Sequence, residues 1–297
     1  MTISIGVLAP RESWHFQDLK RAAETFNREI QLRRVDFNTL TSQLEDGKES
    51  FSDRYGSIAY LDALIVRTMP PGSLQQIIFR MDVLHRLAKS GVRVFNSPRS
   101  VEIAIDKYLS LSLMAEAGIA VPDTSVCQSR RQAASAFQDL GRDVILKPIF
   151  GSMGKHVKRI SSPEELHPAM DQFMERGEVF YLQKFVPHNG TDIRILIVGK
   201  SVFSMKRVNP KGGWLTNIAQ GAHAEPYTPS QREIDLALRA AKANRCVIAG
   251  VDIVYEQASG IPMVLEVNAS PGWEGIQKVC EGDVANSVLQ AVTTNLG

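Results

Sequence analysis

Cysteine is scarce in this chain, and its positions offer no cross-linking framework. The three cysteines, Cys127, Cys246 and Cys280, are widely spaced, and none lies in a CxxC pair or a Cys/His cluster. An odd number of such residues argues against a disulfide scaffold and against a zinc site. The pattern favours a reducing cytoplasm.

Long apolar runs and an excess of one charge are lacking too. No segment approaches the ~20 apolar residues that span a bilayer, and no basic region precedes an apolar one at the N-terminus. The 34 basic and 32 acidic residues are mixed along the chain. We therefore expect neither a membrane nor a nucleic acid as partner.

Two familiar nucleotide-binding motifs are also absent. The first predicted strand runs into Ala9-Pro10-Arg11-Glu12, with no GxGxxG after it. No GxxxxGK[ST] sequence occurs elsewhere. These absences disfavour a dinucleotide-binding fold and the P-loop kinases and GTPases.

The composition that remains is that of a globular protein with a sizeable core. Of the 297 residues, 44% are hydrophobic and 22% charged, which predicts more than one domain. Short apolar runs alternate with helical patterns through the first hundred residues, as in an α/β layer with a mostly parallel sheet. The elements predicted there are strands at 3–9, 31–37, 63–66 and 92–95 and helices at 14–28 and 73–89.

The segment Asn96-Ser97-Pro98 predicts a boundary between two parts of the chain. Ser97 can cap a helix that begins at Pro98, where the missing N–H costs nothing. We expect this helix to carry Asp106 and Lys107. Beyond it, the patterns predict strands at 144–147, 179–186, 193–198, 201–208, 250–255 and 262–267, and helices at 130–140, from Ser162, after Thr228-Pro229 and at 284–294.

Two of these strands carry three oxygen-bearing side chains. Glu266 and Asn268 are two residues apart and so point to the same side of a strand, and a neighbouring strand can bring Asp252 beside them. Carboxylate and amide oxygens suit a hard ion such as Mg²⁺. The alternative is that these are polar strand ends that face water.

A lysine and nearby glycines form a second candidate site. Lys147 ends an apolar strand, where it is well placed to meet phosphate oxygens, and Gly151 and Gly154 let backbone N–H groups approach an anion. Lys107 is another candidate phosphate ligand. A plain hairpin turn would also explain the glycines.

The segment Tyr181-Leu182-Gln183-Lys184-Phe185-Val186-Pro187 alternates apolar and polar residues. Such a linker can offer backbone groups to an adenine edge while apolar side chains enclose the ring. An ordinary edge strand is the alternative.

Taken together, these motifs resemble the ATP-grasp superfamily, and within it the RimK-like glutamate ligases. The resemblance covers most of the chain after Asn96. The residues that carry it are Asn96-Ser97-Pro98, Asp106-Lys107, Leu146-Lys147-Pro148, Gly151-Ser152-Met153-Gly154, Gln183-Lys184-Phe185-Val186, Asp192-Ile193-Arg194, Gly250-Val251-Asp252 and Leu265-Glu266-Val267-Asn268-Ala269-Ser270-Pro271-Gly272.

The resemblance implies an α/β (α+β) ATP-grasp fold in which two antiparallel sheets hold ATP. We expect an N-terminal α/β domain at residues 1–97 and an ATP-grasp domain at 98–297. Within the latter, the lid subdomain would cover about 120–184 and the C-terminal subdomain about 185–297. Homodimers or homotetramers are common in the family.

The resemblance also implies an ATP-dependent ligase that forms a carbon–nitrogen bond. A substrate carboxylate would receive a phosphoryl group from ATP, and an amine would attack the resulting acyl phosphate. Two ions, Mg²⁺ or Mn²⁺, would lie at Asp252, Glu266 and Asn268. The residues implied for ATP are Lys107, Lys147, Gly151, Ser152, Met153, Gly154, Gln183, Lys184, Phe185, Val186 and Asp192. The residues implied for catalysis are Arg194, Arg207 and Lys147, and those for the acceptor are Arg194, Arg207, Asn217 and Gly221.

The segment after Arg207 departs from the family member that modifies a ribosomal protein. Leu215, Ala219 and Gln220 do not match its pattern, although Asn217 and Gly221 do. We therefore expect L-glutamate to be added to a small-molecule carboxylate acceptor, such as a tetrahydromethanopterin-type pterin. The alternatives are ligation to a protein's C-terminal carboxylate and a catalytically silent nucleotide-binding module.

Overall fold

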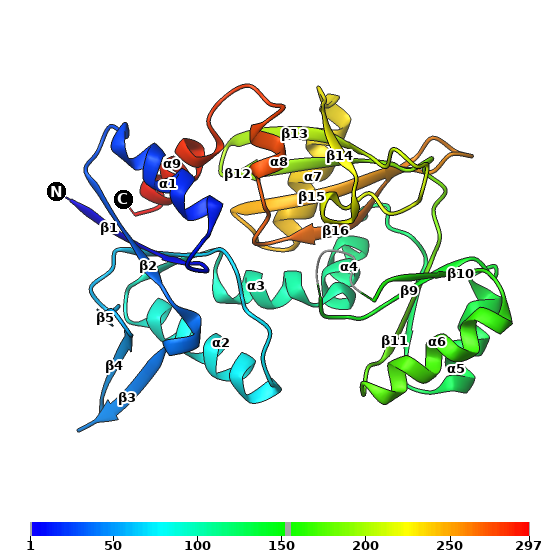
Figure 1. Cartoon of the computed structure of the whole chain (residues 1–297), viewed down its shortest axis with the longest axis horizontal. Coiled ribbons are helices and arrows are strands. Elements are labelled where there is room, and N and C mark those ends of the chain that lie inside the picture. Colours follow the sequence, from blue (N-terminus) through cyan, green and yellow to red (C-terminus); the bar gives the residue numbers. More distant parts are fainter. Residues whose placement is uncertain (1, 152–155, 297) are drawn as a thin grey trace.

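The computed structural model describes residues 2–151 and 156–296. Three larger sheets and their covering helices make up most of the molecule, and the N-terminal sheet and the lid sheet lie on opposite sides of a central antiparallel sheet (Figure 1). The predicted mixed α/β class, with parallel and antiparallel sheets, is confirmed.

The N-terminal sheet is parallel, with the strand order β2-β1-β6-β7. Alternating residues of β1 enter two cores, because Ile5 and Val7 pack with Leu19 of α1, whereas Leu8 packs with Leu84 of α2. The two helices therefore cover opposite faces. The elements of this part are β1 (Ile3–Leu8), α1 (Trp14–Glu24), β2 (Ile30–Val35), β6 (Ala63–Val66), α2 (Leu74–Lys89) and β7 (Arg93–Phe95).

A small antiparallel sheet between β2 and β6 was not predicted from the sequence. It consists of β3 (Thr41–Glu45), β4 (Lys48–Asp53) and β5 (Gly56–Ser57), and a short 3-10 helix, η1 (Phe37–Thr39), precedes it. Its strands are rich in charged and hydroxyl side chains, and most of β3 is exposed. An apolar alternation is therefore too weak there to signal a strand.

The connection to the central part divides into two helices, α3 (Pro98–Ile105) and α4 (Lys107–Glu116). The prediction of one helix that carries Asp106 and Lys107 was wrong. Asp106 has an extended backbone, and its carboxylate accepts the N–H groups of Tyr108 and Leu109, at 3.0 Å each. Asp106 is thus the N-cap of α4, which places Lys107 at the first position of that helix.

The lid sheet has the order β10-β9-β11-β8, with β9 antiparallel to both of its neighbours. Phe137 of α5 and Phe173 of α6 pack with Phe180 and Leu182 of β11 in one core. The elements are β8 (Thr124–Cys127), α5 (Arg130–Asp139), β9 (Val144–Lys147), β10 (Lys158–Ile160), α6 (Pro163–Glu175) and β11 (Phe180–Lys184).

The central sheet is antiparallel, with the order β14-β13-β12-β15-β16. The helix α7 begins at Gln231, where Ser230 and Glu233 form a capping box, so the predicted cap at Thr228-Pro229 was wrong: the observed N-cap, Ser230, lies two residues after Thr228. The elements are β12 (Thr191–Val198), β13 (Ser201–Val208), η2 (Ile218–Gln220), β14 (His223–Pro226), α7 (Gln231–Ala243), β15 (Ile248–Tyr255), β16 (Pro262–Asn268), α8 (Glu274–Gln277) and α9 (Val284–Thr294).

The buried side chain of Asn96 joins the N-terminal sheet to the central sheet. Its amide donates to the carbonyls of Ile248 and Ala269 at 2.6 Å each, and its oxygen accepts the N–H groups of Val247 and Ile248. Residues from both sides of position 97 share one hydrophobic core. The division of the chain at residue 97 therefore stays a prediction.

Candidate active site

A cavity lies between the lid sheet and the central sheet. Its floor comes from β12, β13, β15 and β16, and its roof from β9, β11 and the segments that follow them. The lining residues are Lys107, Ile145, Lys147, Pro148, Gly151, Val157, Gln183, Lys184, Phe185, Val186, His188, Asp192, Arg207, Trp214, Leu215, Thr216, Asn217, Asp252, Leu265 and Glu266. Most of the residues predicted for ATP and metal thus meet at one place.

The predicted metal residues lie on two adjacent strands. Asp252 and Glu266 are paired across β15 and β16, next to a bulge, and Gly250 is paired with Asn268. The amide of Asn268 donates to Glu266 Oε1 at 3.0 Å. Glu266 is partly exposed, whereas the Asp252 side chain is almost fully buried.

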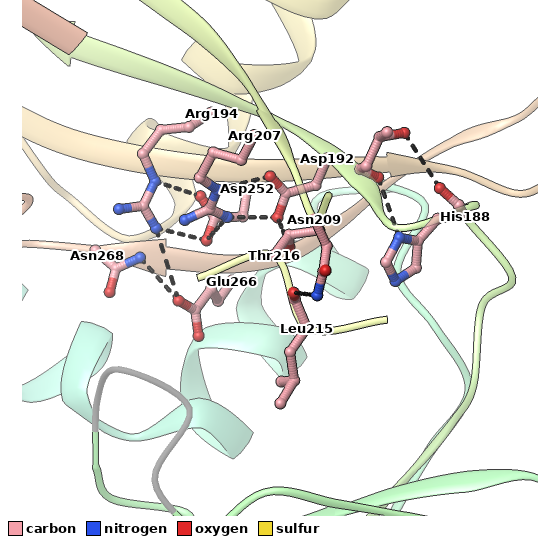
Figure 2. A network of polar contacts seen from close by, with 11 residues as sticks. His188, Asp192, Arg194, Arg207, Asn209, Leu215, Thr216, Asp252, Glu266 and Asn268 are labelled. Carbon is pink, nitrogen blue, oxygen red and sulfur yellow. Dashed lines mark hydrogen bonds and ion pairs between the residues drawn. The ribbon is translucent and has the colours of Figure 1, made fainter. Parts of the chain in front are cut away.

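Two arginines, one from the adjacent strand β12 and one from β13 beyond it, hold Asp252 (Figure 2). Arg194 is its direct partner on β12 and donates to both of its carboxylate oxygens at 2.6 Å. Arg207 lies 2.9 Å from the same carboxylate and also pairs with Asp192. Burial alone would raise the pKa of Asp252, but the charges of Arg194 and Arg207 outweigh it and hold the pKa at about 2.

Asp192 is buried in the same network. It faces Arg207 across β12 and β13, and its second oxygen accepts the hydroxyl of Thr216 at 2.6 Å. Asp192 therefore anchors the segment after β13 to the cavity floor. Its expected contact with the nucleotide stays a prediction.

Two lysines face this acidic group from the other side of the cavity. Lys107 donates to the carbonyls of Ile149 and Gly151, at 3.2 and 2.7 Å, and Lys147 donates to Gln183 Oε1 at 2.9 Å. Neither lysine forms an ion pair with any described residue. Both ammonium groups are therefore held by neutral acceptors, and their charge is available to an anion.

The pKa shifts of Lys107 and Lys147 agree with an anion bound between them. Burial lowers the pKa of Lys107, and Glu266 opposes the shift. Burial also lowers the pKa of Lys147 to about 8, and the charge of Lys107 contributes in the same direction. A polyanion between them would offset both effects, because it favours the charged ammonium forms.

The hinge, residues 183–186, has fewer backbone groups free to bind adenine than the sequence suggested. The N–H of Lys184 donates to Asp123 O at 2.8 Å, and that of Phe185 donates to Asp143 O at 2.9 Å. Of Lys184, Phe185 and Val186, only Val186 has an N–H with no partner in the described chain. The side chain of Gln183 is also committed, since it joins Lys147 to Thr124. Val186 is therefore the hinge residue that can donate to an adenine edge.

Aromatic rings gather near this hinge, and only one of them, Phe185, was named as a site residue from the sequence. The Phe185 ring lies 5.9 Å from that of His188 and 6.4 Å from that of Trp214. The Arg159 guanidinium lies 3.7 Å from the Phe185 centroid. Phe185, His188 and Trp214 all line the cavity, where flat side chains suit a base.

The predicted acceptor residues are only partly brought together. Asn217 lines the cavity with Arg207, whereas Gly221 ends η2 with a φ of 95° and is not a lining residue. Asn209 holds this loop by donating to Leu215 O at 2.7 Å. Ser152, Met153 and Gly154 lie outside the described residues.

The donor set fits a nucleotide with a divalent ion. Asp252 and Glu266 line the cavity opposite Lys107 and Lys147, so phosphate oxygens and a divalent ion would both find partners there. The described part of the chain contains no cluster of three or more His, Cys, Asp or Glu that could hold a metal ion. The fold and the cavity thus define a nucleotide-binding enzyme of the ATP-grasp class.

Comparison with known proteins gives the family. The RimK-like ATP-grasp domain matches residues 104–292. The tetrahydromethanopterin:alpha-L-glutamate ligase of Methanosarcina acetivorans is 29% identical over 92% of this chain and 93% of that protein. The probable alpha-L-glutamate ligase of Mannheimia succiniciproducens is 32% identical over 91% of each. A structure of the ATP-grasp ligase PsnB with a minimal precursor superposes with a TM-score of 0.75 at 22% identity, over 99% of each chain.

The chain belongs to the RimK-like ATP-grasp family of α-L-glutamate ligases. It is an ATP-dependent ligase that forms carbon–nitrogen bonds, as the sequence predicted. Among the described residues, no helix is both long and apolar enough to cross a bilayer.

Proposed function

We propose that this enzyme adds L-glutamate to the carboxylate of a small-molecule acceptor through an acyl phosphate. The observation that carries the proposal is the pair of lysines, partly buried Lys107 and buried Lys147, which face Asp252 and Glu266 and form no ion pair with any described residue. This arrangement suits the phosphates of ATP together with a divalent ion.

The first step is phosphoryl transfer. An oxygen of the acceptor carboxylate attacks the γ-phosphorus, the bond to the β-phosphate oxygen breaks, and ADP leaves. This reaction needs positioning and charge neutralisation more than covalent help. Lys107 and Lys147 hold phosphate oxygens, while Arg194 and Arg207 orient Asp252 and neutralise charge on the acceptor side.

The second step is amide formation. The amine of glutamate attacks the acyl carbon, the carbon–oxygen bond to phosphate breaks, and the ammonium proton passes to solvent. Because water would hydrolyse the acyl phosphate, the cavity has to be covered during this step. The lid sheet and the segment from Trp214 to Asn217 border the cavity on two sides and serve this purpose.

Divalent ions would be held by Asp252, Glu266 and Asn268, and we infer two of them. Bound there, they supply charge stabilisation to the transferred phosphoryl group. Asn268 and Glu266 are already joined by a hydrogen bond, which keeps both oxygens at the same edge of β16. The ATP-grasp ligase PsnB, similar in fold, is known in complex with Mg and ADP.

The acceptor class is inferred from two sources. Relatives at about 30% identity are tetrahydromethanopterin:alpha-L-glutamate ligases, which favours a pterin-type small molecule. The loop after β13 also presents uncharged Leu215, Thr216 and Asn217 to the cavity rather than basic residues that would grip an acidic peptide tail.

The test is a reaction of the full-length chain with ATP, Mg²⁺, L-glutamate and a panel of acceptors. The panel contains tetrahydromethanopterin and peptides with free C-termini. We expect acceptor-dependent ADP release and a mass gain of one glutamyl residue on the pterin. Hydroxylamine added without glutamate should trap the acyl phosphate. Glutamylation of the peptides alone would overturn the small-molecule assignment, and nucleotide binding without ADP release for every acceptor would overturn catalysis.

A further inference from the structure

Arg67 is a buried cation without an anionic partner. It directly follows β6, at the carboxyl edge of the N-terminal sheet, and only 7% of its surface is exposed. The guanidinium carbon lies 4.5 Å from the centre of the Trp273 ring. Its Nε atom has no hydrogen-bond partner, and none of the described residues forms an ion pair with it.

The groups around Arg67 do not neutralise it. Burial, aided by the charge of Arg67, lowers the pKa of His15 to about 3, so this imidazole is neutral. Asp18, the carboxylate that accepts the indole N–H of Trp273 at 2.8 Å, is itself paired with Arg21. Burial lowers the pKa of Arg67 to about 9. An isolated buried charge of this kind is costly to the fold, which is typical of a group that waits for a ligand.

The position of His15 adds a second donor. Its Nε2 atom accepts the backbone N–H of Trp273 at 3.1 Å, so the proton of the neutral ring is on Nδ1. That N–H has no partner among the described residues. Trp273 thus connects a free imidazole N–H to a free guanidinium.

A short segment links this cluster to the metal residues. Ser270, two residues after Asn268, donates to Val66 O at 2.8 Å, directly before Arg67. A Cβ atom placed on Gly250 would lie 2.8 Å from Pro271 and 3.8 Å from Arg194 Nε. The segment from Asn268 to Trp273 therefore passes close to Arg194 at Pro271 and reaches Arg67 at Trp273. It connects β16 to α8 on the side of the N-terminal sheet (Figure 1).

We propose that Arg67, with Trp273 as an apolar wall and His15 as a second donor, binds a carboxylate of the amino acid whose amine is ligated. The inference rests on the proposed function. ATP occupies the side of the cavity near Lys107 and Lys147, so the amine has to approach the acyl phosphate from another side. A guanidinium binds a carboxylate through two parallel hydrogen bonds and would fix the orientation of the amine.

The test is equilibrium binding of L-glutamate to the full-length chain with Mg²⁺ and a non-hydrolysable ATP analogue. Arg67→Met should weaken L-glutamate binding by about tenfold or more, because a charge-assisted hydrogen bond is lost. The affinity of Arg67→Lys for L-glutamate should lie between those of the wild type and Arg67→Met. Arg93→Met, which removes an exposed cation from β7 of the same sheet, should match the wild type. The affinity for the ATP analogue should stay unchanged in all variants, which separates this inference from the nucleotide assignment.

Thermal unfolding without ligand gives a second readout. Arg67→Met keeps an apolar contact with Trp273 and removes the unpaired charge, so the Tm should rise by about 2 °C or more. A purely structural arginine would give a lower Tm instead. Equal L-glutamate binding by wild type and Arg67→Met would overturn the inference. So would weakened binding of tetrahydromethanopterin with unchanged binding of L-glutamate, or failure of the wild type to bind any L-amino acid in a panel.

Discussion

Arg194 and Asp252 are direct partners across β12 and β15, and two hydrogen bonds of 2.6 Å join their side chains. The arginine therefore occupies both oxygens of a residue assigned to the metal. Asp252 also receives Arg207, so its charge is balanced before an ion arrives. In the proposed metal site, binding of Mg²⁺ with ATP would have to redistribute these contacts, which would leave the guanidinium of Arg194 available to a substrate oxygen.

The two carboxylates of the proposed metal site, Asp252 and Glu266, should respond differently to neutralisation. Asp252→Asn leaves Arg194 without its buried partner and Arg207 with Asp192 alone, so the free energy of unfolding should fall by about 3–5 kcal/mol. The side chain of Glu266 is 33% exposed, so Glu266→Gln should abolish ADP release with little change in the free energy of unfolding. Chemical denaturation and an ADP assay on both variants measure this contrast. Near-wild-type turnover of Glu266→Gln would contradict the metal assignment.

Nucleotide affinity should depend on the protonation of Lys147. Its pKa of about 8 in the fold lies below the value of about 10.5 for an exposed lysine. Only the protonated form attracts phosphate, so the affinity for ATP should be constant below pH 8 and fall above it, by at most about tenfold per pH unit. The unfolded chain binds more protons between about pH 8 and 10.5, so the contribution of Lys147 to stability rises across that window. Lys147→Arg should remove the pH dependence of ATP binding. If this variant kept the pH profile of the wild type, titration of Lys147 would not be its cause.

Gln183 should matter through Lys147 rather than through adenine. Gln183→Leu removes the acceptor at 2.9 Å from Lys147 Nζ and should weaken ATP binding by about tenfold, because the buried ammonium loses its hydrogen bond. Gln172→Leu is the matched control. It removes the same kind of acceptor from Lys158 on the exposed side of the lid and should leave ATP binding unchanged. Equal effects of the two variants would contradict a local role.

The cap of α4 should couple helix stability to phosphate binding. Asp106→Ala removes the acceptor for Tyr108 N and Leu109 N and should cost about 0.5–2 kcal/mol in the free energy of unfolding. Because Lys107 is the first residue of this helix, the KM for ATP should rise as well. Ser230→Ala removes a cap from α7, which does not line the cavity, and should reduce stability without a change in this KM. Steady-state kinetics measure the KM for ATP of Asp106→Ala and Ser230→Ala, and thermal unfolding measures their stability.

The sequence was sufficient to predict those helices and strands whose apolar residues recur with a clear local period. The strands that carry Lys147, Asp252 and Glu266 are apolar runs with a polar residue on one face, and such runs have a clear period. Their meeting in one cavity followed from the resemblance to a family. The break at Asp106 was missed because Asp is tolerated within a helix, and only the backbone reveals that it acts as a cap.

Other features depend on long-range contacts and leave no local signal. The N–H groups of Lys184 and Phe185 are taken up by Asp123 and Asp143, a partnership set by how the lid connects to its neighbours. Arg67 follows an apolar strand in a sequence that looks like any strand exit. Its burial against Trp273, more than two hundred residues later, exists only in the folded chain.

The separation of the hydrophobic cores has a consequence for local unfolding. The core around Phe137, Phe173 and Phe180 contains only lid residues, whereas Val7 of β1 and Val288 of α9 share another core. Apart from Tyr181 and Val126, which pack in the core of the central sheet, the lid can therefore open as a subglobal unit while the N-terminal sheet, α9 and the central sheet keep their protection against hydrogen exchange. Nucleotide would then be released by a low-cost fluctuation that leaves the surroundings of Arg67 folded.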